Sequence, residues 1–378
     1  MAAPRVRLAG SAGEIPAADW DRLAGHANPF ARHAFFTALE DSGSATERAG
    51  WRPLHIVAVD GEGGIAGILP GYLKSHSQGE YVFDQGWADA WQRAGGDYYP
   101  KLQHATPFTP ATAPKLLAAD ADTRALLVAA SAAVARENGI SGSHATFLTE
   151  ADAADFSAAG WLERRDVQFH WFNAGYAGFD DFLGSLSSRK RKVLRRERAE
   201  ALAGVDAIER LSGSDLTEAA WDAFWVFYQD TGSRKWGRPY LTRRFFSLIG
   251  ERMGEQIVLL LARKGGRYVA GALNFVGADC IYGRQWGATA HIPFLHFELC
   301  YHQAIDIACE RGLARVEAGA QGQHKVARGY RPVETRSAHF IADPGFRRAV
   351  ADFLARERPA VHAEAEYLAE ALPFRHEE

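Results

Sequence analysis

The pattern of apolar and polar positions occurs twice along the chain. Residues 55–70 and 259–274 align without a gap, and each stretch contains an apolar strand-like run, a turn with glycine and a second run ending in Ala-Gly-x-Leu. This order is typical of a β-hairpin. A helix-like segment opened by a Phe-Phe pair, Phe35-Phe36 or Phe245-Phe246, precedes each hairpin. The pattern therefore predicts a tandem pair of α+β modules.

The remaining periodicity completes each module. In the first half it predicts a helix over 121–138 and strands near 101–105, 144–148 and 161–173. In the second half it predicts strands over 256–262, 267–276, 280–286, 315–318 and 333–341, with helices over 293–311 and 344–372. We therefore expect an α+β fold with a mixed α/β sheet and helices on both faces. The expected domains are 1–173 and 174–378, joined by a basic helix at about 187–203.

Length and composition agree with this division. The chain has 378 residues, and one hydrophobic core stops growing at roughly 250–300 residues. A net charge of −3 disfavours general binding to nucleic acid or membranes. The three cysteines form no CxxC pair, and no apolar run has the length of a signal peptide core or a membrane span. We expect a cytoplasmic protein with no integral membrane segment.

Several segments resemble a known family. They are residues 76–84, 97–101 and 107–110 in the first half, and 187–192, 295–298 and 317–332 in the second, the last containing Glu317-Ala-Gly-Ala-Gln-Gly-Gln-His-Lys325. Together they resemble the FemAB-like family of N-acyltransferases, which are described as peptidoglycan biosynthesis or recognition proteins of proteobacteria. The resemblance implies duplicated domains of the GNAT acyltransferase fold, with the acceptor on the N-terminal side and the donor on the C-terminal side.

The resemblance also implies a reaction. An acyl or aminoacyl group would pass from an activated carrier, acyl-coenzyme A or aminoacyl-tRNA, to the amine of a small molecule or cell-wall precursor, with no tightly bound cofactor. The alternative is a non-catalytic protein that kept the duplicated fold and recognises such a ligand. The sequence leaves both open, together with the oligomeric state.

The glycine-rich segment 317–331 is the main candidate for chemistry. The expected catalytic residues are Glu317, His324, Lys325 and Tyr330, and the expected substrate-binding residues are Gln321 and Arg328. Glycines allow a ligand to approach the backbone closely, and Lys325 and Arg328 supply positive charge. His324 would act as general base and Tyr330 would protonate the leaving group. The alternative is a structural turn with a solvated basic face.

The strand before the long helix supplies further candidates. Alternation places Tyr282 on the same face as Arg284 and Trp286, and the latter two are expected to bind substrate. The following turn resembles the glycine-rich coenzyme A turn, with expected contacts at Gln285, Gly287, Ala288 and Ala290. Its central glycine is displaced by one position, and Pro293 follows. This departure favours the relatives that use aminoacyl-tRNA, or a degenerate donor site.

The first half carries an aromatic and acidic cluster. Its members, all expected to bind substrate, are His76, Glu80, Asp84, Trp87, Tyr98, Tyr99 and Lys101. Carboxylates beside aromatic faces suit an amine-bearing acceptor. Asp84 or Glu80 could instead serve as the base. His76 and Glu80 have no third ligand at a convincing spacing, so no metal site is expected.

A run of positive charge lies at the junction of the modules. We expect a phosphate or RNA patch made of Arg189, Lys190, Arg191, Lys192, Arg195 and Arg196. Such a patch holds phosphates without base specificity, which fits a tRNA acceptor stem, an anionic lipid surface or a nucleotide-linked substrate. A merely solvated helix between the domains is the alternative.

Overall fold

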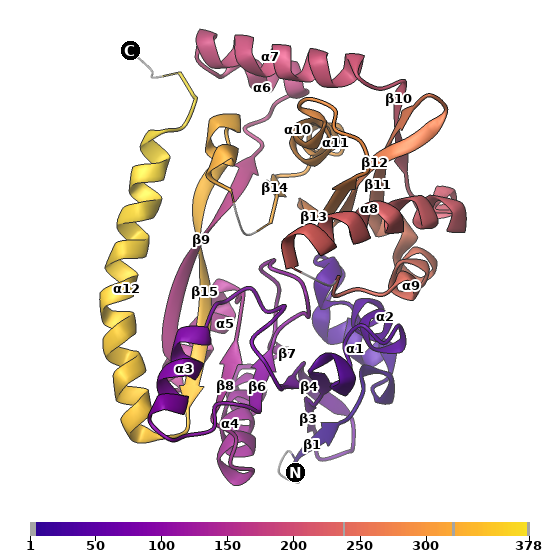
Figure 1. The fold of residues 1–378 in the computed structure, drawn as a ribbon. Helices are drawn as coiled ribbons and strands as arrows, with labels where there is room; N and C mark the ends of the chain where they lie inside the picture. The colour runs from indigo at the N-terminus through magenta and orange to yellow at the C-terminus, as the bar shows by residue number, and fades with distance from the viewer. Residues whose placement is uncertain (1–4, 237–238, 320–321, 376–378) are drawn as a thin grey trace. The chain divides into compact units, whose positions relative to one another are not determined.

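The computed structural model describes residues 5–236, 239–319 and 322–375 (Figure 1). The chain forms two compact units. Unit 1 contains Met1–Asp166 and Glu334–Ala363, and unit 2 contains Val167–Val333 and Glu364–Glu378. The sequence division at 173 placed residues 334–363 in the C-terminal domain, whereas the structure groups them with unit 1. In the described part of the chain, no helix combines the length and the apolar character that a membrane crossing requires.

Unit 1 contains two sheets. One has the strand order β1-β3-β4-β7, and the other runs β2-β5-β6-β8-β15. The strands are β1 (Arg5–Ala9), β2 (Trp51–Pro53), β3 (His55–Val59), β4 (Ile65–Leu69), β5 (Tyr72–Lys74), β6 (Lys101–His104), β7 (Leu117–Ala118), β8 (Gly142–Ala145) and β15 (Arg331–Ile341). The helices are α1 (Ala17–Ala24), α2 (His33–Asp41), α3 (Gln85–Arg93), α4 (Ala121–Glu137), α5 (Glu150–Ala158) and α12 (Pro344–Glu370).

Helix α4 shows how the sequence builds this unit. Asp120 caps its N-terminus by accepting a hydrogen bond from the Thr123 backbone N–H. Leu127 and Val128 are fully buried in a core that also holds Ile56 of β3. Burying side chains of this size contributes about 1.5–3 kcal/mol each. The helix is therefore fixed by its cap and by its apolar side.

Unit 2 contains a single mixed sheet with the order β10-β11-β12-β13-β14-β9. The strands are β9 (Leu162–Phe172), β10 (Ala207–Leu211), β11 (Ile257–Lys264), β12 (Arg267–Val276), β13 (Cys280–Ala288) and β14 (Arg315–Glu317). The helices are α6 (Phe179–Gly184), α7 (Ser188–Ala203), α8 (Glu218–Trp236), α9 (Arg243–Met253), α10 (Leu295–Phe297), a π-helical turn (Glu298–His302), α11 (Gln303–Glu310) and a 3₁₀ segment, η7 (Gln323–Arg328).

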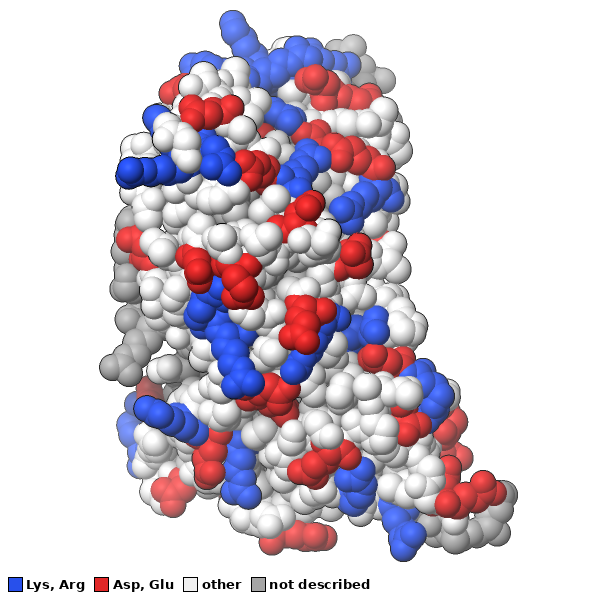
Figure 2. All heavy atoms as spheres, turned by 90° about the vertical axis from the view of Figure 1, so that its right-hand side faces the viewer, with Lys and Arg blue, Asp and Glu red and all other residues white. Residues whose placement is uncertain are grey.

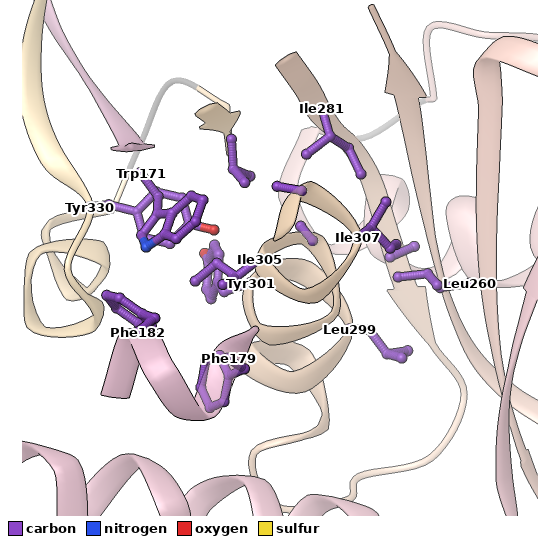
Figure 3. Close-up of a cluster of buried hydrophobic side chains, with 14 of the residues drawn as sticks. Trp171, Phe179, Phe182, Leu260, Ile281, Leu299, Tyr301, Ile305, Ile307 and Tyr330 are labelled. Atoms are coloured by element: carbon purple, nitrogen blue, oxygen red, sulfur yellow. The ribbon is translucent and has the colours of Figure 1, made fainter. Parts of the chain in front are cut away.

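The two faces of the unit 2 sheet pack against different helices. On the α11 face, Leu260 and Ile281 join a large apolar core with Ile305 and Ile307 of α11. Figure 3 shows Trp171 and Tyr330 on the other side of this helix from Ile281. On the α8 face, a side chain at Gly271 would meet Phe224 of α8 at 3.0 Å. The predicted helices on both faces are therefore present in unit 2.

The repeated hairpin is confirmed in both units. Strands β3 and β4 pair antiparallel in unit 1, and β11 and β12 do so in unit 2. The Ala-Gly-x-Leu glycine has the same packing role in each copy. A Cβ at Gly67 would meet Leu127 of α4 at 3.1 Å, and one at Gly271 would meet Phe224 of α8. In both units, glycine lets a helix pack closely on the hairpin.

The last strand of each half pairs differently from the sequence expectation. The strand expected to close the first module extends into unit 2, where His170–Phe172 of β9 pair with β14. The corresponding part of β15, Ala338–Ile341, pairs with β8 of unit 1. Apolar periodicity indicates that a segment is a strand, but it does not select the partner. The pairing explains why residues 334–363 belong to unit 1.

Candidate functional site

The candidate site of unit 2 begins where two parallel strands separate. β13 and β14 pair only at three positions, Cys280 with Arg315, Ile281 with Val316 and Tyr282 with Glu317. β14 then ends, whereas β13 continues to Ala288. Beyond Tyr282, the backbone N–H and C=O groups of β13 on this side therefore do not pair with β14. They can hydrogen-bond to another group. Gly283 and Gly319 lie at this opening, and the nearest atom that an added Cβ on Gly319 would meet, among the described residues, is the Gly283 carbonyl oxygen at 4.0 Å.

Glu317 lies at the point of separation. Its register partners are Tyr282 on β13 and His170 on β9, so the three side chains form a row on the α8 face. Glu317 is 3% exposed, and its Oε1 accepts a hydrogen bond from Arg315 Nε at 3.2 Å. Its Oε2 has no hydrogen-bond partner among the described residues. Burial raises the pKa of Glu317 to about 7, against the opposing effect of Arg315.

His170 contributes an uncharged neighbour. Burial, with the positive charges of Arg315 and Lys325, lowers the pKa of His170 to about 3. Its Nε2 lies 3.9 Å from Glu317 Oε2, which is too long for a hydrogen bond, and 3.4 Å from Gln168 Oε1. Because the imidazole is neutral at pH 7, it does not stabilise the Glu317 carboxylate by charge.

A β-bulge changes the predicted alternation on β13. In the register with β12, Asn274 pairs with Gly283 and Leu273 with Gln285, so Arg284 is skipped. The extra residue reverses the sides of the residues that follow. Trp286 thus packs on the α11 face, 5.1 Å from the His296 ring. The expectation that Tyr282 shares a face with Trp286 was wrong, because Tyr282 lies in the row with Glu317.

Lys325 lies on the 3₁₀ segment η7 after β14. It is 2% exposed, and its Nζ donates a hydrogen bond to the Gly319 carbonyl at 2.8 Å. Nζ is also 5.9 Å from the ring of Phe169, a residue of the α11-face core. Burial lowers the pKa of Lys325 to about 7. Lys325 therefore has both ammonium and neutral amine forms near pH 7.

The other expected residues of segment 317–331 differ in their surroundings. His324 is exposed, with Nε2 2.9 Å from Tyr301 Oη. Tyr330 is fully buried beside Tyr301, and its hydroxyl has no hydrogen-bond partner in the described ranges. Burial raises the pKa of Tyr330 well above its ordinary value. Arg328 is buried and bonded to Glu197 of α7 at 2.7 Å. Gln321 lies outside the described residues.

Gly287, in the expected coenzyme A turn, is required by the packing of α8. A Cβ at Gly287 would lie 2.0 Å from the Phe227 carbonyl oxygen of α8, so this position needs glycine to pack the helix. The Oε1 atom of Gln285 is buried and lacks a hydrogen-bond partner within the described part of the chain. Ala288 ends β13, and Ala290 lies in the loop before α10. Contacts of these residues with a donor stay predictions.

The predicted cluster of the first half is assembled in unit 1. Lys74 and Lys101 lie opposite each other on β5 and β6, fully buried. Lys101 Nζ is 2.6 Å from Glu80 Oε1 and 2.5 Å from Asp84 Oδ2, while Lys74 Nζ is 3.4 Å from Glu80 Oε2. Each Glu80 oxygen therefore has its own lysine partner. Two lysines thus pair with the two carboxylates that were expected to bind an amine, and burial lowers the pKa of one of them, Lys74, to about 7.

Other members of this cluster complete the same network. Tyr98 donates a hydrogen bond to Asp84 at 2.7 Å, and Tyr99 is hydrogen-bonded to Ser77, which also bonds Lys101. The buried Lys101 ammonium keeps the pKa of Asp84 far below its usual range despite burial. The remaining two members lie nearby: Trp87 packs on His339 at 4.9 Å, and His76 Nε2 is 3.0 Å from the Ala49 carbonyl.

The expected phosphate patch lies on α7. Arg189, Lys192, Arg195 and Arg196 are exposed, and Lys190 and Arg191 are half-buried. Among described residues, these six make one ion pair, Arg195 with the exposed Asp180 at 3.8 Å. Lys and Arg side chains line the upper edge of Figure 2, the edge along which α7 runs in Figure 1. The helix therefore presents positive charge to solvent, with the exposed acids Asp180 and Glu200 close by in the sequence.

Sequence reasoning missed two residues that contact the candidate site. His170 is a polar residue within a strand pattern, and its alternation with Gln168 is a signal that could have drawn attention to it. Glu197 is an acid within a basic helix, on the side that carries Leu194 and Ala201. Helical spacing could have placed it inward, but not identified Arg328 as its partner.

Comparisons with known proteins agree with this architecture. The C-terminal domain of a putative lysylphosphatidylglycerol synthetase from Agrobacterium fabrum superposes with a TM-score of 0.54 and 11% identity, over 92% of this chain and 97% of that chain. FemX gives 0.52 and 11%, over 88% and 98%. L-PGS from Bacillus licheniformis gives 0.51 and 10%, over 87% and 98%. At such identities the likeness shows the fold alone. A comparison with curated proteins found no match.

The family comparison goes further than the solved structures. The model of the FemAB-like family, described as peptidoglycan biosynthesis/recognition, matches residues 11–376. The predicted mixed α/β architecture, with the repeated hairpin in both units, is confirmed, and FemX has a similar fold. Since the match takes in nearly the whole sequence, this chain belongs to the FemAB-like family of peptidoglycan biosynthesis or recognition proteins.

Proposed function

We propose that this protein is an N-acyltransferase whose reacting carbonyl lies where β13 and β14 separate. The observation that carries the proposal is Glu317, a buried carboxyl with a pKa of about 7 at the end of β14. A general base works best when its pKa lies near the working pH. Membership in the FemAB-like family and the fold shared with FemX support the same class of reaction.

The proposed reaction balances with the groups present. Glu317 accepts a proton from the amine of the acceptor, the amine nitrogen forms a bond to the acyl carbon, and the bond from that carbon to the carrier breaks. Backbone N–H groups of β13 beyond Tyr282 would stabilise the oxyanion. Lys325, which has an ammonium form near pH 7, would supply the proton that the leaving group takes. Tyr330 is less suited, because its hydroxyl is buried in the apolar core.

The donor class follows from two features of unit 2. The packing of Gly287 against α8 accounts for the glycine at this position without a phosphate-binding role. Helix α7 presents exposed basic side chains that suit a polyphosphate backbone. We therefore favour aminoacyl-tRNA over acyl-coenzyme A as the carrier. The acceptor would be the amine of a cell-wall precursor, in keeping with the family's description.

The test is transfer by the purified protein. Acyl-coenzyme A thioesters and aminoacyl-tRNA would be supplied as donors and nucleotide-linked peptidoglycan precursors as acceptors, with mass spectrometry detecting the new amide. We expect transfer by the wild type and a loss of about 10²–10⁴-fold in Glu317→Gln. Glu251→Gln is the matched control, because Glu251 is an exposed carboxylate of the same unit. Equal rates in the wild type and Glu317→Gln would remove Glu317 from the mechanism.

A non-catalytic binding protein is the second candidate. The paired carboxylates of unit 1 favour it, because Glu80 and Asp84 already have lysine partners where an amine ligand was expected. In that case the precursors would bind, as measured by native mass spectrometry, while none of the donors would give a new amide. Binding without transfer would therefore select this alternative.

A further inference from the structure

Arg328 connects three elements of unit 2. Its Nη2 atom donates a hydrogen bond to Glu197 Oε2 of α7 at 2.7 Å, and its Nη1 atom donates to the His324 carbonyl at 3.0 Å. Its guanidinium carbon lies 3.4 Å from the centre of the Phe297 ring of α10. Arg328 is only 6% exposed. Its charge is therefore directed to groups inside the unit rather than to solvent.

Glu197 supplies the negative charge that allows the Arg328 guanidinium to be buried. It is 8% exposed and lies on the buried side of α7, whereas Arg196 beside it is exposed. A buried guanidinium without an anionic partner is strongly destabilising. The bond to Glu197 is also charge-assisted, which makes it stronger than a neutral hydrogen bond. Without Glu197, Arg328 would have to leave its place between α7 and Phe297.

Besides the contacts of Arg328, the segment η7 is held by a hydrogen bond between His324 Nε2 and Tyr301 Oη and by the burial of Val326 in the core. η7 lies between two glycines with positive φ, Gly322 at 117° and Gly329 at 81°. Within η7, Val326 and Lys325 are buried, and the Lys325 side chain bonds back to Gly319 of the same loop. Glycines at both ends leave the backbone with many alternative conformations. The guanidinium bond to the His324 carbonyl fixes the residue directly before Lys325.

We infer that Glu197 is a positioning residue, which acts through Arg328 to hold η7 and so keeps Lys325 Nζ desolvated beside the Gly319 carbonyl. The inference rests on the proposed function only for the role of Lys325 as proton donor to the leaving group. The position of the amine itself can be measured without any turnover. Arg328 then serves as a clamp on the loop, a role different from its expected one in substrate binding.

The test measures the loop and the amine in the full-length protein. Hydrogen exchange is followed in residues 322–330, and the reactivity of Lys325 is followed by trace acetylation with acetic anhydride between pH 6 and 11. The variant is Glu197→Gln, which keeps the shape and removes the charge. The control is Glu200→Gln, an exposed glutamate on the same helix. Arg328→Lys is a second variant, because lysine keeps the charge but loses the planar fork that reaches both acceptors.

In Glu197→Gln and Arg328→Lys we expect exchange of residues 322–330 to be about tenfold or more faster than in the wild type. The midpoint of Lys325 acetylation should rise from about 7 toward the ordinary lysine value. Glu200→Gln should leave both unchanged. The inference would be overturned if residues 322–330 exchanged hydrogen at the wild-type rate in both variants and the midpoint of Lys325 acetylation did not change. If the midpoint of Lys325 acetylation shifts in the variants but the wild type shows no acyl transfer, the role of Glu197 is supported. Only the proposed transferase function is then contradicted.

Discussion

At the scale of single residues, Glu317 combines two opposing properties. It is buried with one oxygen lacking a partner among the described residues, and burial raises its pKa from 4.5 to about 7. A carboxyl that prefers the protonated form when folded lowers the free energy of unfolding as pH rises from its unfolded to its folded pKa. The property that suits Glu317 to act as a base near neutral pH therefore costs stability.

The cost can be measured. Each pKa unit corresponds to about 1.36 kcal/mol, so ionisation of Glu317 costs about 3 kcal/mol above pH 7. Because no cost exists below pH 4.5, Glu317→Gln should raise the free energy of unfolding at pH 8 and change it little at pH 4 to 4.5. Urea unfolding at both pH values, compared with Glu251→Gln, checks this. A Glu317→Gln variant that is less stable than the wild type at pH 8 would contradict it.

The sequence was enough to identify some residues of the candidate site, but not their contacts or their burial. The density of polar side chains among glycines was enough to select Glu317 and Lys325. Their altered pKa values come from burial, which local sequence does not reveal. His170 and Glu197 approach the site from distant parts of the chain, through β9 and α7. Only tertiary structure brings such residues to Glu317 and Arg328.

At the scale of elements, α7 has two sides with different tasks. Its buried side carries Glu197, which pairs with Arg328, and Arg198, which pairs with Glu298 and Asp306. Its exposed side carries Arg189, Lys192, Arg195 and Arg196 of the predicted phosphate patch. The sequence predicted the basic helix and its charges. It did not predict that two of the charged residues, Glu197 and Arg198, bind other elements of unit 2.

The exposed side of α7 should determine binding of a tRNA. Arg189, Lys192 and Arg196 are all exposed and recur at helical spacing. Replacing the three by glutamate should weaken binding of a labelled tRNA and lower the salt slope of log Kd by about 0.9 for each phosphate that is no longer neutralised. Fluorescence anisotropy at several salt concentrations measures this. Arg244→Glu, at an exposed arginine of α9, is the control. If the triple variant had the same tRNA affinity and salt slope as the wild type, α7 would be a solvated helix with no role in phosphate binding.

The β13 strand shows where periodicity misleads at this scale. A strict period of two placed Tyr282 and Trp286 on one face, but the bulge at Arg284 places them on opposite faces. One extra residue is invisible in an apolar pattern, because the residues on both sides of it still alternate. The bulge lies beside the separation of β13 and β14. This is the place where sequence alternation and the structure of the site differ most.

At the scale of the whole molecule, the sequence repeat predicted the duplicated architecture. Two hairpins with equivalent glycines, each with a helix packed on it, occur in the two units as expected. The exchange of final strands was not predictable, because β9 and β15 are both 11 residues long and both have their buried residues toward the C-terminal end. The chain therefore forms each unit from two separate segments. Through this exchange, His170 of β9 becomes the register partner of Glu317.

The central claim is that Glu317, at the separation of β13 and β14, acts as the base of an acyl transfer. The most direct measurement is the pH dependence of kcat/KM for transfer from aminoacyl-tRNA or an acyl-coenzyme A thioester, in the wild type and in Glu317→Gln. We predict a bell-shaped wild-type profile, in which the rising limb reports ionisation of Glu317, with a pKa of about 7, and the falling limb reports loss of the Lys325 ammonium proton. We also predict that this rise disappears in Glu317→Gln. A wild-type profile that is retained in Glu317→Gln would contradict this role for Glu317.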